Sequence, residues 1–272
     1  MDARLQLRVQ RYGWDKASSY YEPSWREQLA PAQEKLLEMA ALRPGERVVE
    51  TACGTGLVTI PIAEAVGPAG HVEATDLSRV MVEMLAARCA ELGFGDRVTS
   101  RRMGAEELDF GDGEFDVALS ALGLMYVPDP RAAVAEMHRV LRPGGRAVAA
   151  VWGERKRCGW AGIFPVVDSR VESDVCPMFF ALGTGGSLER EFERAGFTDI
   201  RSEILSTVLE YPDERSALSA AFEGGPVALA YDRFDEATRA EAHRDYLETI
   251  AEYRVGDGYR IPGEFVVVRG ER

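Results

Sequence analysis

Short apolar stretches alternate with helical stretches over residues 47–152, and this alternation constrains the fold more than any other feature. Glycine or proline follows most of these stretches and keeps the connections short. Strands are predicted at 47–51, 71–75, 98–103, 115–120 and 146–152. Helices are predicted between them at 57–66, 77–92 and 130–141. Repeated strand–helix units of this kind form a parallel sheet covered by helices on both faces.

The flanking regions add further elements to this core. A helix is predicted at 25–42, with Pro31 in its first turn. After a looser stretch at 153–186, a helix at 187–195, a strand at 200–211, a mostly helical region at 212–253 and a last strand at 265–269 follow. Because strands return after the looser stretch, we expect one doubly wound α/β sheet, mostly parallel and seven-stranded, of the Rossmann-like kind.

Composition limits the partners. The 272 residues include 32 Lys and Arg against 45 Asp and Glu, for a formal charge of −13. Such a charge repels nucleic acids and anionic membranes, so we expect a small-molecule substrate and neither a nucleic acid nor a membrane partner. We find no signal peptide, no apolar stretch long enough to span a bilayer, and no cysteine spacing typical of a metal or disulfide framework. We therefore expect a cytoplasmic protein without a metal site; the sequence leaves monomer and homodimer open.

The turn after the first strand reads ETACGTG at residues 50–56. It stands at the carboxyl end of a strand, where open α/β sheets bind ligands. A dinucleotide motif would place a third glycine where this chain has Thr59, and the carboxylate of Glu50 would repel a pyrophosphate. The turn therefore favours a ligand with a cationic amino group, although a purely structural turn stays an alternative.

This turn resembles motif I of the class I S-adenosylmethionine-dependent methyltransferases, in which an acid precedes Gly-x-Gly-x-Gly. The chain keeps Glu50, Cys53, Gly54 and Gly56 and has Ala52 at the first glycine position, where we expect the turn to survive. The resemblance continues at 72–78, 103–110, 115–120 and 137–145 and covers about residues 47–152. The pattern is most similar to the ubiquinone/menaquinone-biosynthesis (methyltransferase type 11) branch, whose cap helix resembles the segment with Tyr12 and Trp14.

The resemblance implies how the cofactor is held. Asp76 would accept hydrogen bonds from the ribose hydroxyls, and Leu77 would lie against the adenine; a helix cap is the alternative role of Asp76. Gly104 stands where related sequences have Asp, which leaves the backbone of Ala105 and Glu106 to bind the adenine edge. The methionine portion would face Ser120 and Leu122. The predicted site residues for S-adenosylmethionine are Glu50, Ala52, Cys53, Gly54, Gly56, Asp76, Leu77, Ala105, Glu106, Ser120 and Leu122.

The same resemblance implies one domain over residues 1–272. It would consist of a helical cap at 1–43, a cofactor-binding core at 44–152, an insert at 153–186, and the rest of the sheet with a helical lid at 187–272. The methyl acceptor would bind between the cap, the loop after Ser120 and the insert. Aromatic side chains suit a planar or apolar acceptor, although half or more of them could simply pack the cap. The predicted pocket residues are Trp14, Tyr20, Tyr21, Met125, Tyr126, Trp152 and Trp160.

No catalytic residue is assigned. Methyl transfer from a sulfonium needs mainly positioning and desolvation, and His71, His138 and His243 all have ordinary structural roles available. The basic cluster at 155–157 could attract a carboxylate, and the pair Cys158 and Cys176 keeps a thiol or arsenite acceptor as an alternative. Two further alternatives are a nicotinamide-dependent oxidoreductase and a protein that binds the cofactor without turnover.

Overall fold

A mixed, mostly parallel β-sheet forms the centre of the molecule. The computed structural model describes residues 3–171 and 178–272. Along the sheet the strand order is β3-β2-β1-β4-β5-β8-β6, and the short β7 pairs with β8. The strands are β1 (Arg47–Thr51), β2 (His71–Asp76), β3 (Val98–Arg102), β4 (Phe115–Ala121), β5 (Leu141–Trp152), β6 (Thr198–Tyr211), β7 (Arg254–Val255) and β8 (Gly258–Glu271). The predicted Rossmann-like sheet is confirmed, with β7 as an addition.

The parallel strands end together at one edge of the sheet. Thr51, at the end of β1, lies beside Thr75 of β2 and beside Ser120 of β4. Every residue of β1 after Arg47 is buried, as expected for a central strand with both faces covered. The segments that follow β1, β2 and β4 are therefore neighbours in space, which places the predicted cofactor residues at one edge.

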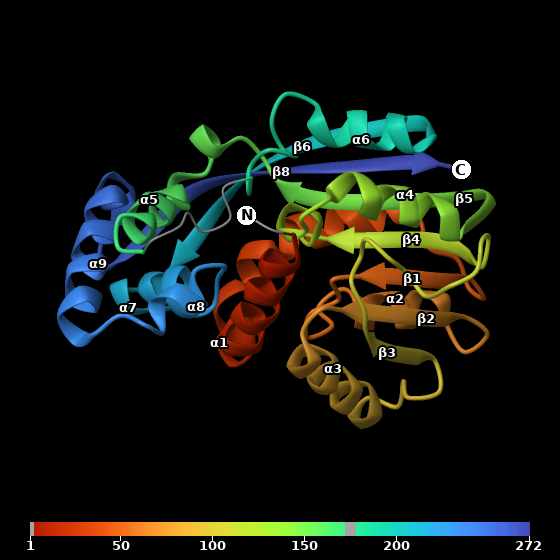
Figure 1. Cartoon of the computed structure of the whole chain (residues 1–272), viewed down its shortest axis with the longest axis horizontal. Coiled ribbons are helices and arrows are strands. Elements are labelled where there is room, and N and C mark those ends of the chain that lie inside the picture. The colour runs from red at the N-terminus through yellow and green to blue at the C-terminus, as the bar shows by residue number, and fades with distance from the viewer. Residues whose placement is uncertain (1–2, 172–177) are drawn as a thin grey trace.

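Helices cover the sheet and gather at one end of the molecule (Figure 1). They are α1 (Ala3–Ala40), α2 (Thr59–Val66), α3 (Arg79–Glu91), α4 (Pro130–Val140), α5 (Ile163–Asp168), α6 (Ser187–Ala195), α7 (Glu214–Leu218), α8 (Ala228–Tyr231) and α9 (Glu236–Thr249). Helix α4 packs beside α6, whereas α1 packs against α3 and across β5. None of the helices in the described ranges has both the length and the apolar character needed to cross a bilayer.

The predicted N-terminal helical cap is present as α1, but the helix expected to begin at residue 25 begins much earlier. The sequence pattern predicts a helix from residue 25 with Pro31 in its first turn, but α1 begins at Ala3 and holds both Pro23 and Pro31 in its interior. An interior proline removes a backbone hydrogen bond and is normally a helix breaker. Here the burial of apolar side chains along one side of the helix offsets that cost. The buried side chains are Ala17, Trp25, Leu29, Ala32, Leu36 and Ala40.

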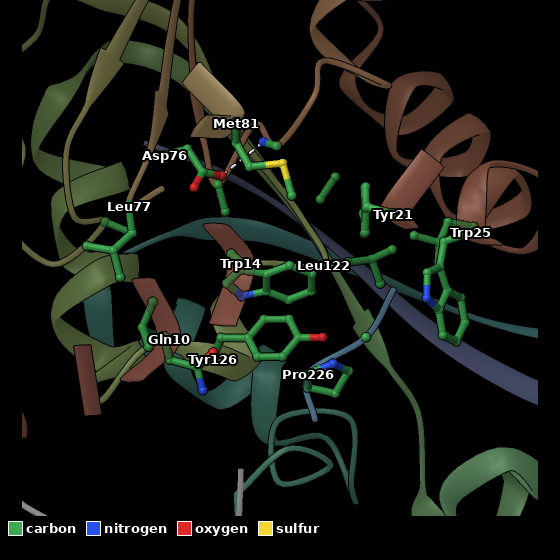
Figure 2. A pocket seen from close by; sticks show the side chains of 18 of the residues that line it. Gln10, Trp14, Tyr21, Trp25, Asp76, Leu77, Met81, Leu122, Tyr126 and Pro226 are labelled. Carbon is green, nitrogen blue, oxygen red and sulfur yellow. Dashed lines mark hydrogen bonds between the residues drawn. The ribbon is translucent and has the colours of Figure 1, made fainter. Parts of the chain in front are cut away.

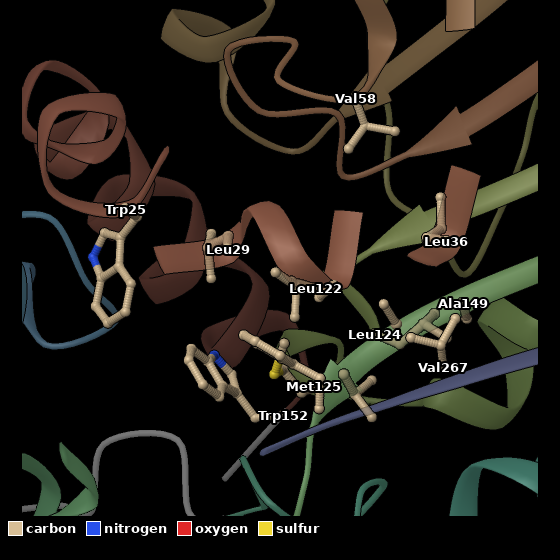
Figure 3. Packing of buried hydrophobic residues seen from close by; sticks show 14 of the residues in the cluster. Trp25, Leu29, Leu36, Val58, Leu122, Leu124, Met125, Ala149, Trp152 and Val267 are labelled. Carbon is tan, nitrogen blue, oxygen red and sulfur yellow. The ribbon is translucent and has the colours of Figure 1, made fainter. Parts of the chain in front are cut away.

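The hydrophobic core joins α1 to the sheet (Figure 3). Leu29 of α1, Leu122 after β4, Trp152 of β5 and Val267 of β8 all belong to one cluster of buried residues. Burial of a leucine or valine side chain contributes about 1.5–3 kcal/mol, so α1 is held by its contacts and not by helix propensity alone.

The last part of the sheet is antiparallel. β8 pairs with both β5 and β6, and it begins at Gly258, before the start predicted at residue 265. Helices α7, α8 and α9 lie between β6 and β8 in sequence and share one end of the molecule with α5 (Figure 1). This confirms the mostly helical region predicted at 212–253, while its role as a lid, and the predicted domain boundaries, stay predictions.

Candidate functional site

The turn at residues 50–56 has a left-handed backbone at three positions. The φ angles are 56° at Ala52, 54° at Gly54 and 90° at Gly56. The angle at Gly56 favours glycine, and a Cβ there would lie 2.4 Å from Cδ1 of Leu85, so that this side chain would have to shift. Ala52 adopts its angle with a side chain present, at a cost of about 1–2 kcal/mol relative to glycine. The turn therefore forms with alanine at its first glycine position.

Asp76 fixes this turn to the start of α3. Its Oδ2 accepts a hydrogen bond from the backbone N–H of Gly54 at 2.9 Å, and its Oδ1 accepts one from Ser78 at 2.8 Å. The N-cap of α3 is Ser78, whose Oγ accepts from the N–H of Met81, so the alternative that Asp76 caps the helix is wrong. Burial raises the pKa of Asp76 to about 6. Asp76 thus places a buried carboxyl group at the edge of the sheet, in contact with the turn.

Glu50 lies below the turn and not at its surface. Only 1% of the residue is exposed, and its Oε2 accepts a hydrogen bond from Oγ1 of Thr59 at 2.6 Å. Burial raises the pKa of Glu50 to about 8, so this carboxyl group is mostly protonated at neutral pH. A role of Glu50 toward a cationic amino group stays a prediction.

A cavity opens beside the turn and brings together most of the predicted cofactor residues (Figure 2). The predicted residues that line it are Ala52, Gly54, Asp76, Leu77, Ala105, Glu106 and Leu122. The predicted residues that do not line it are Glu50, Cys53, Gly56 and Ser120. Met81 of α3 and Met103, which follows β3, also line it and were not predicted. Figure 2 shows Asp76, Leu77 and Met81 on one side of the space, with Trp14 and Tyr126 across from them.

Aromatic side chains also line this cavity. Of the predicted acceptor residues, those that line it are Trp14, Tyr21, Tyr126, Trp152 and Trp160. Met125 lines an adjoining cavity that shares Trp14 with the first, whereas Tyr20 is 44% exposed and lines neither. Trp14 meets Tyr126 edge to face, with ring centroids 5.0 Å apart. The site prediction therefore fails for Tyr20, whose side chain leaves α1 on the solvent side.

Sequence reasoning missed several lining residues of α1. They are Leu7, Gln10, Trp25 and Leu29. Together with Trp14 and Tyr21 they recur every three, four or seven residues, which is the period of one helix face. This period is visible in the sequence, but it extends from residue 7 to residue 29, and the helical period predicted from the sequence covers only residues 25–42.

Charge in the cavity is of one sign. Among the described residues that line it, Asp76 and Glu106 are acidic and none is Lys, Arg or His. Burial raises the pKa of Glu106, whose Oε1 accepts a hydrogen bond from the N–H of Asp129 at 3.0 Å. The site therefore suits a cation or a neutral molecule better than a phosphate.

The three histidines lie elsewhere. His71 contacts Glu73 and Thr99 at the start of the strands, and His138 packs edge to face on Phe197. His243 is 2.8 Å from the hydroxyl of Tyr231, and burial lowers its pKa.

Two other features of the sequence also stand outside the cavity. The cluster at Arg155–Arg157 is exposed, and Lys156 pairs with Glu154 at 2.7 Å. Cys158 is buried with its pKa raised to about 12, while Cys176 lies outside the described residues. A thiol with so high a pKa is mostly un-ionised at neutral pH and therefore a weak nucleophile and metal ligand.

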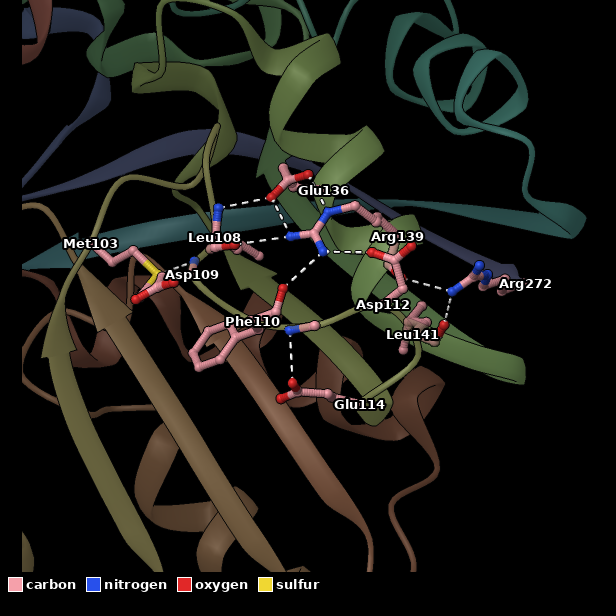
Figure 4. A network of polar contacts seen from close by, with 11 residues as sticks. Met103, Leu108, Asp109, Phe110, Asp112, Glu114, Glu136, Arg139, Leu141 and Arg272 are labelled. Atoms are coloured by element: carbon pink, nitrogen blue, oxygen red, sulfur yellow. Dashed lines mark hydrogen bonds and ion pairs between the residues drawn. The ribbon is translucent and has the colours of Figure 1, made fainter.

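A polar network supports the segment that carries Ala105 and Glu106 (Figure 4). Arg139 of α4 donates to the carbonyl oxygens of Leu108 at 2.9 Å and Phe110 at 2.8 Å. It also pairs with Glu136, whose Oε2 accepts from the N–H of Leu108 at 2.8 Å. Helix α4 therefore fixes the loop that follows β3 through side chains that do not line the cavity.

Known methyltransferases are similar in sequence to this region. Residues 48–145 match the family model described as a methyltransferase domain. Nocamycin O-methyltransferase of Saccharothrix syringae is 36% identical over 134 residues, which are 49% of this chain and 47% of that protein. A ubiquinone/menaquinone biosynthesis C-methyltransferase of Psychromonas ingrahamii is 36% identical over 110 residues, 40% of this chain and 44% of that protein. The matches thus span about half the length, or slightly less, of these curated relatives.

The fold has relatives among solved structures. The protein YcgJ from Bacillus subtilis has a TM-score of 0.64 at 16% identity, with 89% of this chain and 98% of that chain covered. At this identity the likeness concerns the fold. The match of residues 48–145 to the methyltransferase domain agrees with the resemblance that the five motifs indicate.

Proposed function

We propose that this chain, whose residues 48–145 form a class I S-adenosylmethionine-dependent methyltransferase domain, methylates a small molecule with a planar or apolar body. The observation that carries the proposal is the shared cavity. Its lining includes the turn at Ala52 and Gly54 with Asp76, and the aromatic group around Trp14 and Trp160. A donor bound beside the turn and an acceptor bound among the aromatic side chains would therefore meet inside one cavity.

The residues at the turn fit the cofactor. The carboxyl group of Asp76 has no basic partner in the described lining and stands ready to accept hydrogen bonds from ribose hydroxyls. Leu77, Met81 and Met103 offer apolar contacts to a flat base, and the backbone of Ala105 and Glu106 would bind its edge. Glu50, Cys53, Gly56 and Ser120 would act from behind the cavity wall, by keeping the turn in shape.

Methyl transfer requires mainly that the protein positions the donor and the acceptor and excludes water. When bound, S-adenosylmethionine supplies a methyl group that its sulfonium charge already activates. Asp76 and Glu106 give the lining an acidic character that favours this cationic donor. Trp14 contacts both Tyr21 and Tyr126 edge to face, and these rings would exclude water from the space between donor and acceptor. No general base is assigned, and no histidine is among the described lining residues.

The comparisons do not support the alternatives. Neither the nicotinamide-dependent oxidoreductase nor binding without turnover finds support in them. A thiol or arsenite acceptor is not favoured by any contact of Cys158. A cytoplasmic location and the absence of nucleic-acid partners stay predictions.

Titration calorimetry tests the cofactor. We expect S-adenosylmethionine and S-adenosylhomocysteine to bind and NAD not to bind. Absence of S-adenosylmethionine binding at millimolar concentration would contradict the proposal. A panel of phenols, quinones, amines, thiols and arsenite, with release of S-adenosylhomocysteine as the readout, then tests turnover; if no acceptor of the planar or apolar kind is methylated, the proposed substrate class is wrong.

A further inference from the structure

Two tryptophans that line the cavity have indole N–H groups without a hydrogen-bond partner among the described residues. They are Trp25 and Trp160, which are 5% and 3% exposed. Buried tryptophan N–H groups are nearly always paired, because an unpaired donor loses its hydration without compensation. Two unpaired donors in one wall therefore indicate a place for an acceptor atom from outside the chain.

The two tryptophans come from different parts of the sequence, and their rings lie side by side. Trp25 belongs to α1, and Trp160 belongs to the short helix Gly159–Gly162 after β5. Both line the cavity that also contains Asp76. Their ring centroids lie 5.8 Å apart with an angle of 70° between the planes, so one small molecule can contact both rings. Figure 2 shows the nitrogen-bearing edge of Trp25 turned toward the space between Leu122 and Pro226.

We propose that these two N–H groups bind an oxygen atom of the methyl acceptor, and that the acceptor is a planar, uncharged molecule with a carbonyl or phenol oxygen. This inference rests on the proposed function, because it places the acceptor among the aromatic side chains of the cofactor cavity. An ammonium group has no lone pair to accept from an indole N–H. A carboxylate or phosphate would face Asp76 and Glu106 without any basic side chain in the described lining.

The aromatic surroundings agree with a flat ligand. Trp152 packs on Trp160 with ring centroids 4.8 Å apart, and Gly225 and Pro226 close the same wall. A planar ring system would stack in this space while its oxygen meets the two donors. The N–H groups thus orient the acceptor, and their role is recognition and positioning.

Two probes that differ in one oxygen atom test this. 1-Acetylnaphthalene carries a carbonyl oxygen, and 1-ethylnaphthalene has the same ring system without one. In ¹H–¹⁵N spectra of the full chain, which has 4 tryptophans, the indole signals of Trp25 and Trp160 are assigned from the variants Trp25→Phe and Trp160→Phe. We expect acetylnaphthalene to move both indole N–H signals downfield, and ethylnaphthalene not to do so. Equal shifts with the two probes would overturn the proposal.

Affinities provide a second readout. Each of the two variants should weaken acetylnaphthalene about fivefold or more, the usual range for one lost hydrogen bond, and leave ethylnaphthalene nearly unchanged. Trp14→Phe is the matched control, because Trp14 lines the same cavity and should affect both probes alike. Loss of affinity for both probes in Trp25→Phe and Trp160→Phe would contradict oxygen recognition.

The two proposals fail separately. The titrations are run with and without S-adenosylhomocysteine, whose own binding is measured first. A wild-type chain that does not bind S-adenosylhomocysteine contradicts the proposed function. The indole shifts of the wild-type chain with the ketone decide the present inference in either case.

Discussion

Ala52 and Gly123 face each other so closely that a Cβ on Gly123 would lie 2.3 Å from the Cβ of Ala52. Ala52 lies in the turn at residues 50–56, and Gly123 lies just after β4, the strand that pairs with β1. The side chain at the usual first glycine of the motif is thus accommodated because its neighbour has none.

This contact predicts a pair of compensating substitutions. Gly123 has φ −99°, which suits any residue, so Gly123→Ala should destabilise only through the clash, by about 1–3 kcal/mol. Ala52→Gly removes the clashing methyl group and relieves the left-handed strain, so the double variant should regain most of the loss. Urea unfolding of the four proteins measures this; an equal loss in both backgrounds would show that another contact is responsible.

Replacement of Asp76 should weaken cofactor binding. In the wild type both carboxylate oxygens of Asp76 accept hydrogen bonds from backbone N–H groups. The amide of Asp76→Asn can accept such bonds only at its single oxygen atom. We expect at least about a tenfold loss of affinity for S-adenosylhomocysteine, with a stability loss of about 1–3 kcal/mol. Asp116→Asn is the control, because Asp116 also accepts a backbone N–H, from Arg47 at 2.7 Å, but lies outside the cavity. Unchanged affinity in Asp76→Asn would remove Asp76 from the ribose role.

The stability of the ligand-free protein should fall as pH rises because of Glu50. Its pKa is about 8 in the folded chain and about 4.5 when unfolded, so the folded state holds an extra proton between these values. Stability from this group is therefore greatest at low pH and is lost up to about pH 8, by at most about 1.4 kcal/mol per pH unit. Unfolding free energies at about pH 5.5, 6.5 and 8 should show a flatter profile in Glu50→Gln than in the wild type or in the exposed control Glu64→Gln. Parallel profiles in all three would contradict the raised pKa.

Cofactor affinity should rise with pH through the titration of Asp76. Its pKa of about 6 means that the carboxyl group is largely protonated at pH 5 and ionised at pH 7.5. An ionised carboxylate accepts hydrogen bonds from ribose hydroxyls better than a carboxylic acid does, so S-adenosylhomocysteine should bind more tightly at pH 7.5. Calorimetry across this interval measures the change. If the same rise occurred in Asp76→Asn, another group would be the source.

Replacement of Arg139 should weaken cofactor binding although Arg139 does not line the cavity. Arg139→Met removes the hydrogen bonds to the carbonyl oxygens of Leu108 and Phe110, so we expect a stability loss of about 1–3 kcal/mol and a severalfold loss of cofactor affinity. Hydrogen exchange should accelerate over residues 104–112. Arg131→Met, at an exposed position of the same helix, should change neither. Faster exchange without any change in affinity would show that this loop does not contribute to binding.

Local sequence patterns were sufficient to predict the strands of the parallel sheet and the glycine-rich turn after β1. Strand and helix periods, together with glycine positions, report the backbone conformation of a few consecutive residues, and parallel strands necessarily bring their carboxyl ends together. The sequence alone therefore places Asp76, Leu77 and Ala105 near Gly54, and the cavity contains all of them.

The tertiary structure decided the aromatic lining and the true surroundings of Glu50. The sequence pattern places Pro31 in the first turn of a helix, but packing against the sheet keeps α1 continuous from Ala3 to Ala40, and Trp25 lines the cavity. The meeting of Trp25 with Trp160 joins residues 135 positions apart (160 − 25), which no local pattern encodes. The sequence by itself determined the alternation of strands and helices over residues 47–152 and the glycine-rich turn after β1. Packing between distant segments determined which side chains line the cavity, because burial and desolvation depend on neighbours that only the folded chain brings together.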